Sequence, residues 1–260
     1  MSREPQRNEG TKGFGADRYV VPLFLCGSLL LSSAEAQRAE PGRTEYLGRP
    51  IAQTMHYLGA PWLVRESRDR EEEPARLLAS LGVKPGQTVC DLGCGNGFYT
   101  LRLAELVQPA GRVLAVDIQP EMLQMLGQRA EARSVPNVET IEGAVDDPRL
   151  PPAAVDLVLL VDVYHEFSHP PEMLAAIHAS LRPAGRVALV EFRAEDPDVP
   201  IKPLHKMTQA QCVKEFAANG YKLVGQYDDL PWQHVLFFAR DDSPLGRVPL
   251  VAWDPAPPAP

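Results

Sequence analysis

Residues 89–98 read Val89-Cys90-Asp91-Leu92-Gly93-Cys94-Gly95-Asn96-Gly97-Phe98, and they are the most informative segment of the chain. A short buried-type strand with an acid near its end is followed by a glycine-rich turn and then by helical spacing. Glycines let the backbone adopt positive φ and approach a ligand closely. The start of the next helix then offers free N–H groups to an anionic group. The stretch therefore predicts a strand–turn–helix unit that binds a ligand along its turn.

The chain around this unit alternates between strand-like and helix-like segments from about residue 73 to residue 240. We expect strands at 88–92, 112–117, 138–142, 155–161, 186–192, 221–227 and 235–239. We expect helices at 98–107, 120–132, 171–181 and 209–219. The strand 155–161 is nearly all apolar, as a central parallel strand is when helices cover both faces of the sheet. The last two strands are too close in sequence for a crossover and should pair antiparallel. The pattern predicts a doubly wound α/β domain over residues 73–240 with a mostly parallel, seven-stranded sheet.

An N-terminal helical extension is expected before this domain. Residues 49–76 contain an apolar stripe followed by a charged stretch, which indicates one or two helices. We interpret residues 37–72 as a cap or lid segment, with His56 and Trp62 facing the substrate, because a pocket in such a fold needs a cover. The alternative is a solvated helix that packs on the sheet.

The two ends of the chain are not expected to belong to the fold. Residues 1–18 carry several basic side chains, residues 20–31 are an apolar run, and Ala34-Glu35-Ala36 follows. This layout is typical of a secretory signal peptide cleaved after Ala36, which predicts an exported protein with no transmembrane segment in the mature chain. The alternative is a disordered extension on a cytoplasmic protein. Residues 241–260 are rich in proline and are expected to form a disordered tail.

Composition narrows the class of partner. The 260 residues carry a net charge of −8 and form no long basic run. A nucleic-acid partner normally requires a basic face, so we expect a small-molecule, lipid or protein substrate instead. The four cysteines are Cys26, Cys90, Cys94 and Cys212. Their spacing provides neither a convincing disulfide nor a zinc-ligand set, so no metal site is predicted.

The spacing of the glycines distinguishes two kinds of nucleotide site. A dinucleotide fingerprint G-x-G-x-x-G would need a glycine at position 98, where the chain has Phe98. The observed pattern is D-x-G-x-G-x-G, with Asp91 two residues before the first glycine. In this pattern the chain resembles the class I S-adenosylmethionine-dependent methyltransferases, and the resemblance covers about residues 73–240.

The resemblance implies a set of cofactor contacts. Asp117, at the end of the second strand, would accept both ribose hydroxyls, and Ile118 would pack on the adenine. Asp91 would lie near the methionine ammonium, and the backbone of Gly93 and Gly95 would contact the methionine part. The complete implied set is Asp91, Gly93, Cys94, Gly95, Gly97, Asp117, Ile118, Ala144, Val145 and Asp162. Many relatives have an aspartate where this chain has Ala144, so the adenine amino group would need another acceptor, such as Asp146, Asp147 or a backbone carbonyl.

A second group of residues follows the fourth strand. The segment Val163-Tyr164-His165-Glu166-Phe167 resembles a bacterial subgroup of the same family. We expect His165 to act as general base and Glu166 to orient it, with Tyr164 beside them, because an acceptor that carries a proton can need a base. The alternative is a histidine that only caps or packs. Arg193 and His205 could bind an acidic group of the acceptor, although exposed loop charges would look the same.

The sequence thus predicts an S-adenosylmethionine-dependent methyltransferase that acts by in-line displacement. It leaves the acceptor open among small molecules, lipids or quinones, and protein side chains, and it leaves the oligomeric state open. Two alternatives are an NAD(P)-dependent oxidoreductase on a similar fold and a catalytically silent S-adenosylmethionine-binding protein.

Overall fold

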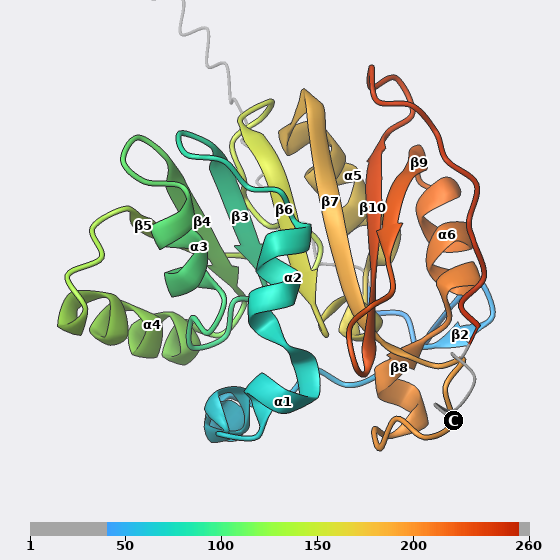
Figure 1. Cartoon of the computed structure of the whole chain (residues 1–260), viewed down its shortest axis with the longest axis horizontal. Coiled ribbons are helices and arrows are strands. Elements are labelled where there is room, and N and C mark those ends of the chain that lie inside the picture. Colours follow the sequence, from blue (N-terminus) through green and yellow to red (C-terminus); the bar gives the residue numbers. More distant parts are fainter. Residues whose placement is uncertain (1–40, 255–260) are drawn as a thin grey trace, which may run out of the picture. The chain divides into compact units, whose positions relative to one another are not determined.

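One large sheet organises the described part of the chain. The structure, a computed structural model, describes residues 41–254, so the expected signal peptide lies outside the described residues. The sheet has eight strands in the order β5-β4-β3-β6-β7-β10-β9, with β8 paired to β7 (Figure 1). The strands are β3 (Thr88–Leu92), β4 (Arg112–Asp117), β5 (Val138–Glu142), β6 (Val155–Val161), β7 (Leu181–Arg193), β8 (Lys206–Met207), β9 (Tyr221–Tyr227) and β10 (Gln233–Arg240).

The directions of the strands confirm a mostly parallel sheet. The pairs β4–β5, β3–β4, β3–β6 and β6–β7 are parallel, and β10 runs antiparallel to both β7 and β9. The predicted count of seven strands is wrong, because β8 pairs parallel with the end of β7, Phe192 lying opposite Lys206. A strand of two residues has no periodicity, so nothing in the sequence pattern could reveal it.

Helices cover both faces of the sheet, as a doubly wound fold requires. One face carries α2 (Pro74–Ser80), α3 (Thr100–Leu106) and α4 (Pro120–Ala132), and the other carries α5 (Pro170–Ser180) and α6 (Gln209–Ala217). Successive side chains of a strand point to opposite faces. On β3, Val89 therefore packs with Leu77 of α2, whereas Cys90 joins the cluster that contains Leu174 of α5.

The segment before the sheet is only partly helical. It consists of a hairpin of β1 (Glu45–Tyr46) and β2 (Arg49–Pro50), the 3-10 helix η1 (Tyr57–Val64), and α1 (Arg68–Glu72). The helical expectation for residues 49–76 therefore fails at its start, where Glu45 pairs antiparallel with Pro50. The tight turn uses Leu47 and Gly48, both at positive φ.

The C-terminal segment differs from the expected disordered tail. Residues 241–254 form no helix or strand but pack along the sheet. The Val248 N–H donates to the Leu223 carbonyl, and the Val251 N–H donates to Gln226.

Among residues 41–254, no helix is long and apolar enough to cross a bilayer.

The topology creates a crevice at one edge of the sheet. The chain runs outward from β3 through β4 to β5, and it later continues on the other side of β3 through β6 to β7. The order of strands thus reverses between β3 and β6. In open α/β sheets, ligands bind outside the carboxyl ends of the strands at such a switch point.

Candidate functional site

A cavity of about 480 Å³ lies at this edge, against the loops that follow β3, β4, β6 and β7. Its volume falls in the usual range for small-molecule and cofactor sites, about 300–1,000 Å³. Of the predicted residues, its lining includes Trp62, Gly93, Gly95, Asp117, Ile118, Ala144, Val145, Asp162, His165, Glu166 and His205. Most of the predicted site residues therefore lie on one cavity, although most of the lining consists of residues that the sequence did not single out.

The glycine turn has no room for side chains. Gly93, Gly95 and Gly97 have φ of 72°, 52° and 85°. A Cβ atom at Gly93 would lie 2.4 Å from Cγ2 of Val163, and one at Gly97 would lie 2.1 Å from Cδ1 of Leu126. Conformation and space both require glycine here, so the turn brings bare backbone to the cavity wall at Gly93 and Gly95.

Asp117 fixes this turn at the end of β4. Its Oδ2 accepts a hydrogen bond from the Gly95 N–H at 2.9 Å, and its Oδ1 accepts from the Gln119 N–H at 2.9 Å. Burial raises the pKa of Asp117 above its ordinary value, although these backbone hydrogen bonds oppose the shift. Each carboxylate oxygen can accept a further hydrogen bond, so Asp117 keeps acceptor capacity toward the cavity.

Asp91 has a different position. It is buried, and its Oδ2 accepts a hydrogen bond of 2.5 Å from the Thr100 hydroxyl on α3. Burial raises its pKa to about 6. With Gly93 and Cys94, Asp91 lines a small neighbouring cavity of about 30 Å³ rather than the main one. Asp91 therefore joins the turn to α3, and its carboxylate is already engaged.

Asp162 follows β6 and has an oxygen without a partner. Its backbone adopts φ of 52°, and its Oδ2 accepts from the side-chain amide of Gln233 at 2.8 Å. Its Oδ1 is buried and has no hydrogen-bond partner among the described residues. Burial raises the pKa of Asp162 well above its ordinary value, and the charges of Glu72 and Glu191 add to the shift. Because Asp162 lines the cavity, a ligand that donates hydrogen bonds would find an acceptor here.

His165 is held from behind by a carboxylate. It lies in the 3-10 helix η2 (Tyr164–Glu166), and its Nδ1 is 2.7 Å from Oε2 of Glu191 on β7. The other oxygen, Oε1, accepts from the His165 backbone N–H at 3.1 Å. A carboxylate only accepts, so Nδ1 carries the hydrogen and Nε2 presents a lone pair. Burial lowers the pKa of His165, but the charge and hydrogen bond of Glu191 outweigh burial and leave the pKa raised.

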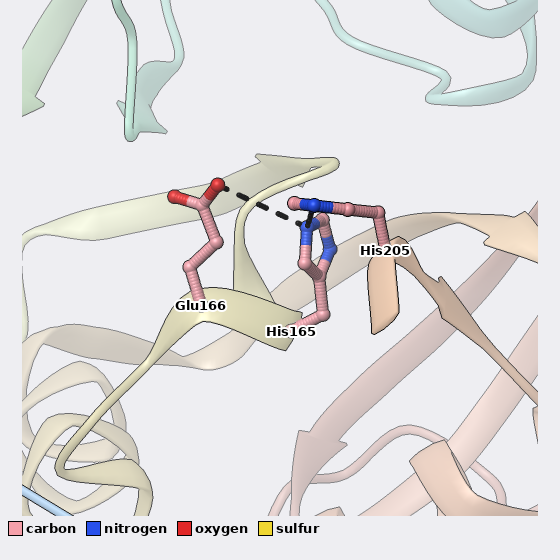
Figure 2. A group of neighbouring side chains, drawn as sticks. All are labelled: His165, Glu166 and His205. Carbon is pink, nitrogen blue, oxygen red and sulfur yellow. Dashed lines mark hydrogen bonds and ion pairs between the residues drawn. The ribbon is translucent and has the colours of Figure 1, made fainter. Parts of the chain in front are cut away.

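Two further side chains face this Nε2 atom. Nδ1 of His205, in the 3-10 helix η3 (Pro203–His205), lies 3.1 Å from it, and Oε1 of Glu166 lies 4.0 Å from it (Figure 2). Burial raises the pKa of Glu166 to about 7. The orienting role expected for Glu166 thus falls geometrically to Glu191, whereas Glu166 lies on the cavity side of the ring.

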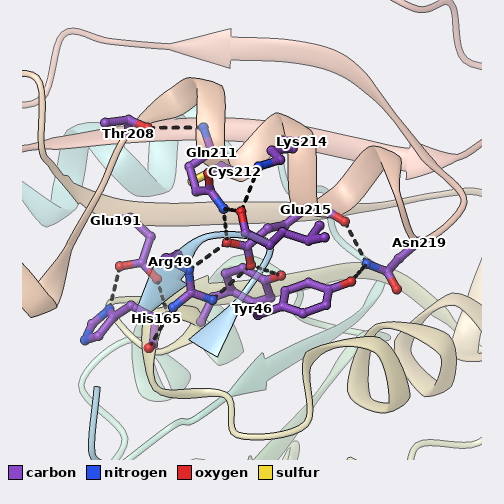
Figure 3. A network of polar contacts seen from close by, with 12 residues as sticks. Tyr46, Arg49, His165, Glu191, Thr208, Gln211, Cys212, Lys214, Glu215 and Asn219 are labelled. Atoms are coloured by element: carbon purple, nitrogen blue, oxygen red, sulfur yellow. Dashed lines mark hydrogen bonds and ion pairs between the residues drawn. The ribbon is translucent and has the colours of Figure 1, made fainter. Parts of the chain in front are cut away.

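A buried ion pair supports the loop that carries His165. Arg49 of β2 binds both carboxylate oxygens of Glu215 on α6 at 2.7 and 2.9 Å, and its Nη1 donates to the His165 carbonyl (Figure 3). The Tyr164 hydroxyl donates to the same Glu215 carboxylate at 2.8 Å. The sequence predicts Tyr164 among the catalytic side chains, but Tyr164 is fully buried and does not line the cavity.

The segment that the sequence predicts as a lid places only some of its residues at the cavity. Trp62 and Leu63 of η1 line the cavity, and the carbonyl of Ala60 accepts from Asn96 in the glycine turn at 3.1 Å. His56 is exposed; its ring accepts from the Leu58 N–H and does not line the cavity. The segment thus covers the turn through Trp62 and Leu63 but does not direct His56 inward.

Arg193 has a structural position rather than a place at the cavity. It is buried, and its guanidinium donates to the carbonyls of Asp228 and Gln233 and stacks on the ring of Trp253. Gly97 likewise packs on α4 outside the cavity lining.

The sequence interpretation missed several site residues. Glu191 is one acid at the end of the apolar run Val187–Val190, and Arg68 and Glu72 form an i,i+4 pair whose side chains both line the cavity. A lone acid in an otherwise apolar strand was the available signal, because a buried charge needs a partner.

Comparison with known proteins matches the chain to methyltransferases. The sequence profile described as "Methyltransferase domain" matches residues 83–233. Over 112 residues the chain is 32% identical to the 2-phytyl-1,4-naphtoquinone methyltransferase of Nostoc sp., covering 43% of this chain and 49% of that protein. It is 30% identical over 112 residues to the ubiquinone/menaquinone biosynthesis C-methyltransferase UbiE of Ectopseudomonas mendocina, covering 43% of this chain and 44% of that protein.

A solved structure shows the same fold. The SAM-dependent methyltransferase from Aquifex aeolicus superposes with a TM-score of 0.67 at 23% identity, over 71% of this chain and 98% of that one. The chain spans about half or less of the length of the curated relatives it matches.

Proposed function

This chain belongs to the family of S-adenosylmethionine-dependent methyltransferases, and we propose that it methylates a small, largely apolar acceptor held beside His165. The observation that carries the proposal is the convergence of Asp117, Asp162 and His165 on one cavity. The carboxylates of Asp117 and Asp162 can accept hydrogen bonds from the hydroxyl and ammonium groups of the cofactor. The Nε2 lone pair of His165 can accept the proton of a nucleophile.

The carboxyl end of β4 fits the adenosine part of the cofactor. Asp117 retains one acceptor position on each oxygen, which matches the two ribose hydroxyls. Ile118 and Val145 are 37% and 40% exposed, and both line the cavity. Exposed apolar side chains on a cavity wall provide a surface on which a flat base can pack.

The loop after β6 fits the methionine part. An unpaired buried acceptor costs about 1–3 kcal/mol, and an ammonium group would satisfy Oδ1 of Asp162. We assign the ammonium contact to Asp162 rather than to Asp91, because the Asp91 carboxylate is engaged by Thr100. Gly93 and Gly95 line the same cavity as Asp162.

S-adenosylmethionine supplies, when bound, a sulfonium methyl group that passes to the acceptor while the electron pair of the broken C–S bond stays on sulfur. The chain holds the acceptor at attack distance and excludes water, which is the main catalytic contribution for such a displacement. His165 accepts the acceptor's proton at Nε2. Glu191 keeps the opposite nitrogen protonated and so keeps that lone pair in the cavity.

Apolar side chains line the cavity that contains His165, and they favour an acceptor with a ring or another apolar body. Phe192 follows Glu191 on β7, Ile201 precedes the helix that carries His205, and Met173 of α5 also lines the cavity. Two of the similar proteins are named for methylating quinone-type molecules, which supports an acceptor of that size and character. The net charge of −8 disfavours a nucleic acid.

The proposal is tested by measuring methyl transfer. The full chain is incubated with S-adenosylmethionine and a panel that contains a dihydroxynaphthalene, a phenol, a thiol and an amine, and S-adenosylhomocysteine and methylated products are followed by mass spectrometry. We expect turnover with a ring acceptor and its loss in His165→Gln. Tight cofactor binding without transfer to any acceptor would instead support the catalytically silent binding protein.

A further inference from the structure

We infer that His165, His205 and Glu166 form a binding site for a divalent transition-metal ion at the acceptor end of the cavity. Their ligand atoms all lie within 4.8 Å of one another. All three side chains line the cavity, and they come from two separate loops, after β6 and after β7. Figure 2 shows the His205 imidazole and the Glu166 carboxylate beside the His165 ring, each joined by a dashed line to the same ring nitrogen of His165.

The distances suit a common ion. Zinc binds imidazole nitrogen at about 2.0–2.1 Å, so two nitrogens of a tetrahedral site lie about 3.3 Å apart. Nε2 of His165 and Nδ1 of His205 are 3.1 Å apart. Oε1 of Glu166 lies 4.0 Å from Nε2, so this second distance is about 0.7 Å longer than the edge of a tetrahedral site and must shorten when an ion binds.

The carboxylate of Glu191 fixes His165 in the orientation that a metal ligand needs. Metal-bound histidines usually donate their other ring N–H to a carboxylate, which fixes the tautomer and the ring orientation. Glu191 does this for His165 at 2.7 Å, and its side chain is completely buried. Arg49 additionally holds the His165 carbonyl at 3.1 Å. The lone pair of Nε2 is thus aimed before any ligand arrives.

A simple histidine–histidine hydrogen bond is the competing explanation for the 3.1 Å contact. Such a bond would need the ring hydrogen of His205 to be on Nδ1. It would not explain why the Glu166 carboxylate lies beside the two rings, or why all three side chains border the open cavity. Those two features are what an ion with a vacant coordination position requires.

The donor set selects the kind of ion. Two imidazoles and one carboxylate favour zinc, iron(II) or neighbouring transition ions, whereas magnesium and calcium prefer oxygen ligands. Three protein ligands with an open position are typical of catalytic rather than structural zinc sites. The open position faces the space assigned above to the acceptor.

This inference rests on the proposed function and deepens it in one respect. With an ion bound, Nε2 of His165 is a ligand and no longer the base proposed above, and the ion instead holds the acceptor's oxygen or sulfur as its anion. The acceptor class then narrows to molecules with a metal-coordinating hydroxyl or thiol, and the proton leaves to water when the acceptor coordinates.

The test measures metal binding directly. The full chain is stripped with a chelator, then titrated with Zn²⁺ by calorimetry and with Co²⁺ by visible absorption, which reports tetrahedral coordination. We expect one ion per chain and at least a tenfold loss of affinity in His205→Ala. His205 is only half-buried, so this variant should keep its fold, which circular dichroism checks. His56→Ala, which removes an exposed histidine outside the cavity, should bind as the unaltered chain does.

Glu191→Gln should weaken Zn²⁺ binding about 10- to 100-fold, as loss of an outer-shell carboxylate does. The inference is overturned if the unaltered chain shows no saturable one-to-one binding, or if His205→Ala and His56→Ala bind alike. Titration with S-adenosylmethionine in the same preparation separates the two claims, since failure to bind the cofactor contradicts the proposed function and leaves the ion isotherm interpretable.

Discussion

Replacing Glu191 by glutamine should reverse the tautomer of His165. The two oxygens of Glu191 accept from two donors of the same residue, the His165 backbone N–H at 3.1 Å and Nδ1 at 2.7 Å. Glutamine has one oxygen and one NH₂ group and cannot accept at both places. If its NH₂ group faced the backbone N–H, a buried donor would be left unpaired at a cost of about 1–3 kcal/mol.

The arrangement that avoids this cost places the glutamine oxygen on the backbone N–H and its NH₂ group on Nδ1. Nδ1 then accepts, the ring hydrogen moves to Nε2, and the lone pair leaves the cavity. Loss of a correctly oriented base lowers the rate of transfer about 10²- to 10⁴-fold. Loss of one charge-assisted hydrogen bond also lowers the free energy of unfolding by about 1.5–3 kcal/mol.

The assay is ¹⁵N NMR of histidine-labelled protein, which distinguishes the two tautomers, together with S-adenosylhomocysteine formation. The pKa of His165 should fall in the variant, since the charge that raises it is gone and burial remains. Glu172→Gln, which alters a half-buried carboxylate paired with Arg43, is the matched control and should change neither quantity. An Nε2 atom that stays unprotonated in Glu191→Gln, together with a rate change of less than threefold, would refute the predicted reversal of the tautomer.

Three further predictions concern stability, pH and processing. Gly97→Ala should lower the free energy of unfolding by about 2–4 kcal/mol, because the new Cβ combines φ of 85° with a 2.1 Å contact to Leu126. Gly127→Ala, on a helix where the new Cβ meets open space, should raise the free energy of unfolding by about 0.5–1 kcal/mol. Equal effects of the two substitutions in denaturant titrations would contradict this prediction. Burial raises the pKa of Asp91 from 3.8 to about 6 in the folded chain, so its contribution is fully present below the lower value and is lost as pH rises through the higher one. That difference corresponds to about 3 kcal/mol, and Asp91→Asn should flatten the decline of unfolding free energy between about pH 4 and about pH 7; an unchanged pH profile would count against it. Residues 1–36 predict export and cleavage after Ala36, which N-terminal sequencing of secreted protein from a bacterial host checks, and an intact N-terminus on a cytoplasmic product would show the prediction to be wrong.

The regular parts of the fold could be predicted from the sequence because local pattern determines them. The strands 88–92, 112–117, 138–142 and 155–161 and the helix 120–132 have the predicted bounds. The apolar runs of the strands 88–92, 112–117 and 155–161 are buried beneath helices, and glycine or proline lies beside the strands 88–92 and 138–142. The strand β7 starts at Leu181 instead of 186, because its first residues pair with Val155 through an irregular register that no local pattern contains.

The sequence located the cavity residues whose place depends on the local backbone, but not the contacts that depend on a distant partner. Asp117 and the glycines could be located because they end a strand and form its turn. Glu191 could not be paired with His165, since 26 residues separate them and only the parallel pairing of β6 with β7 brings them together. Tyr164 was wrongly directed to the cavity because the sequence does not show that Glu215 of α6 binds its hydroxyl from the other side.

The most direct test of the account is a calorimetric titration of the full chain with S-adenosylmethionine, repeated with Asp117→Ala and with Asp242→Ala, an exposed carboxylate at the end of β10. We expect one-to-one binding that Asp117→Ala weakens about 10- to 150-fold, the equivalent of about 1.5–3 kcal/mol for lost charge-assisted hydrogen bonds. Asp242→Ala should leave the affinity unchanged. Absence of binding to the unaltered chain, or equal affinity in the two variants, would contradict the assignment of the cavity to this cofactor.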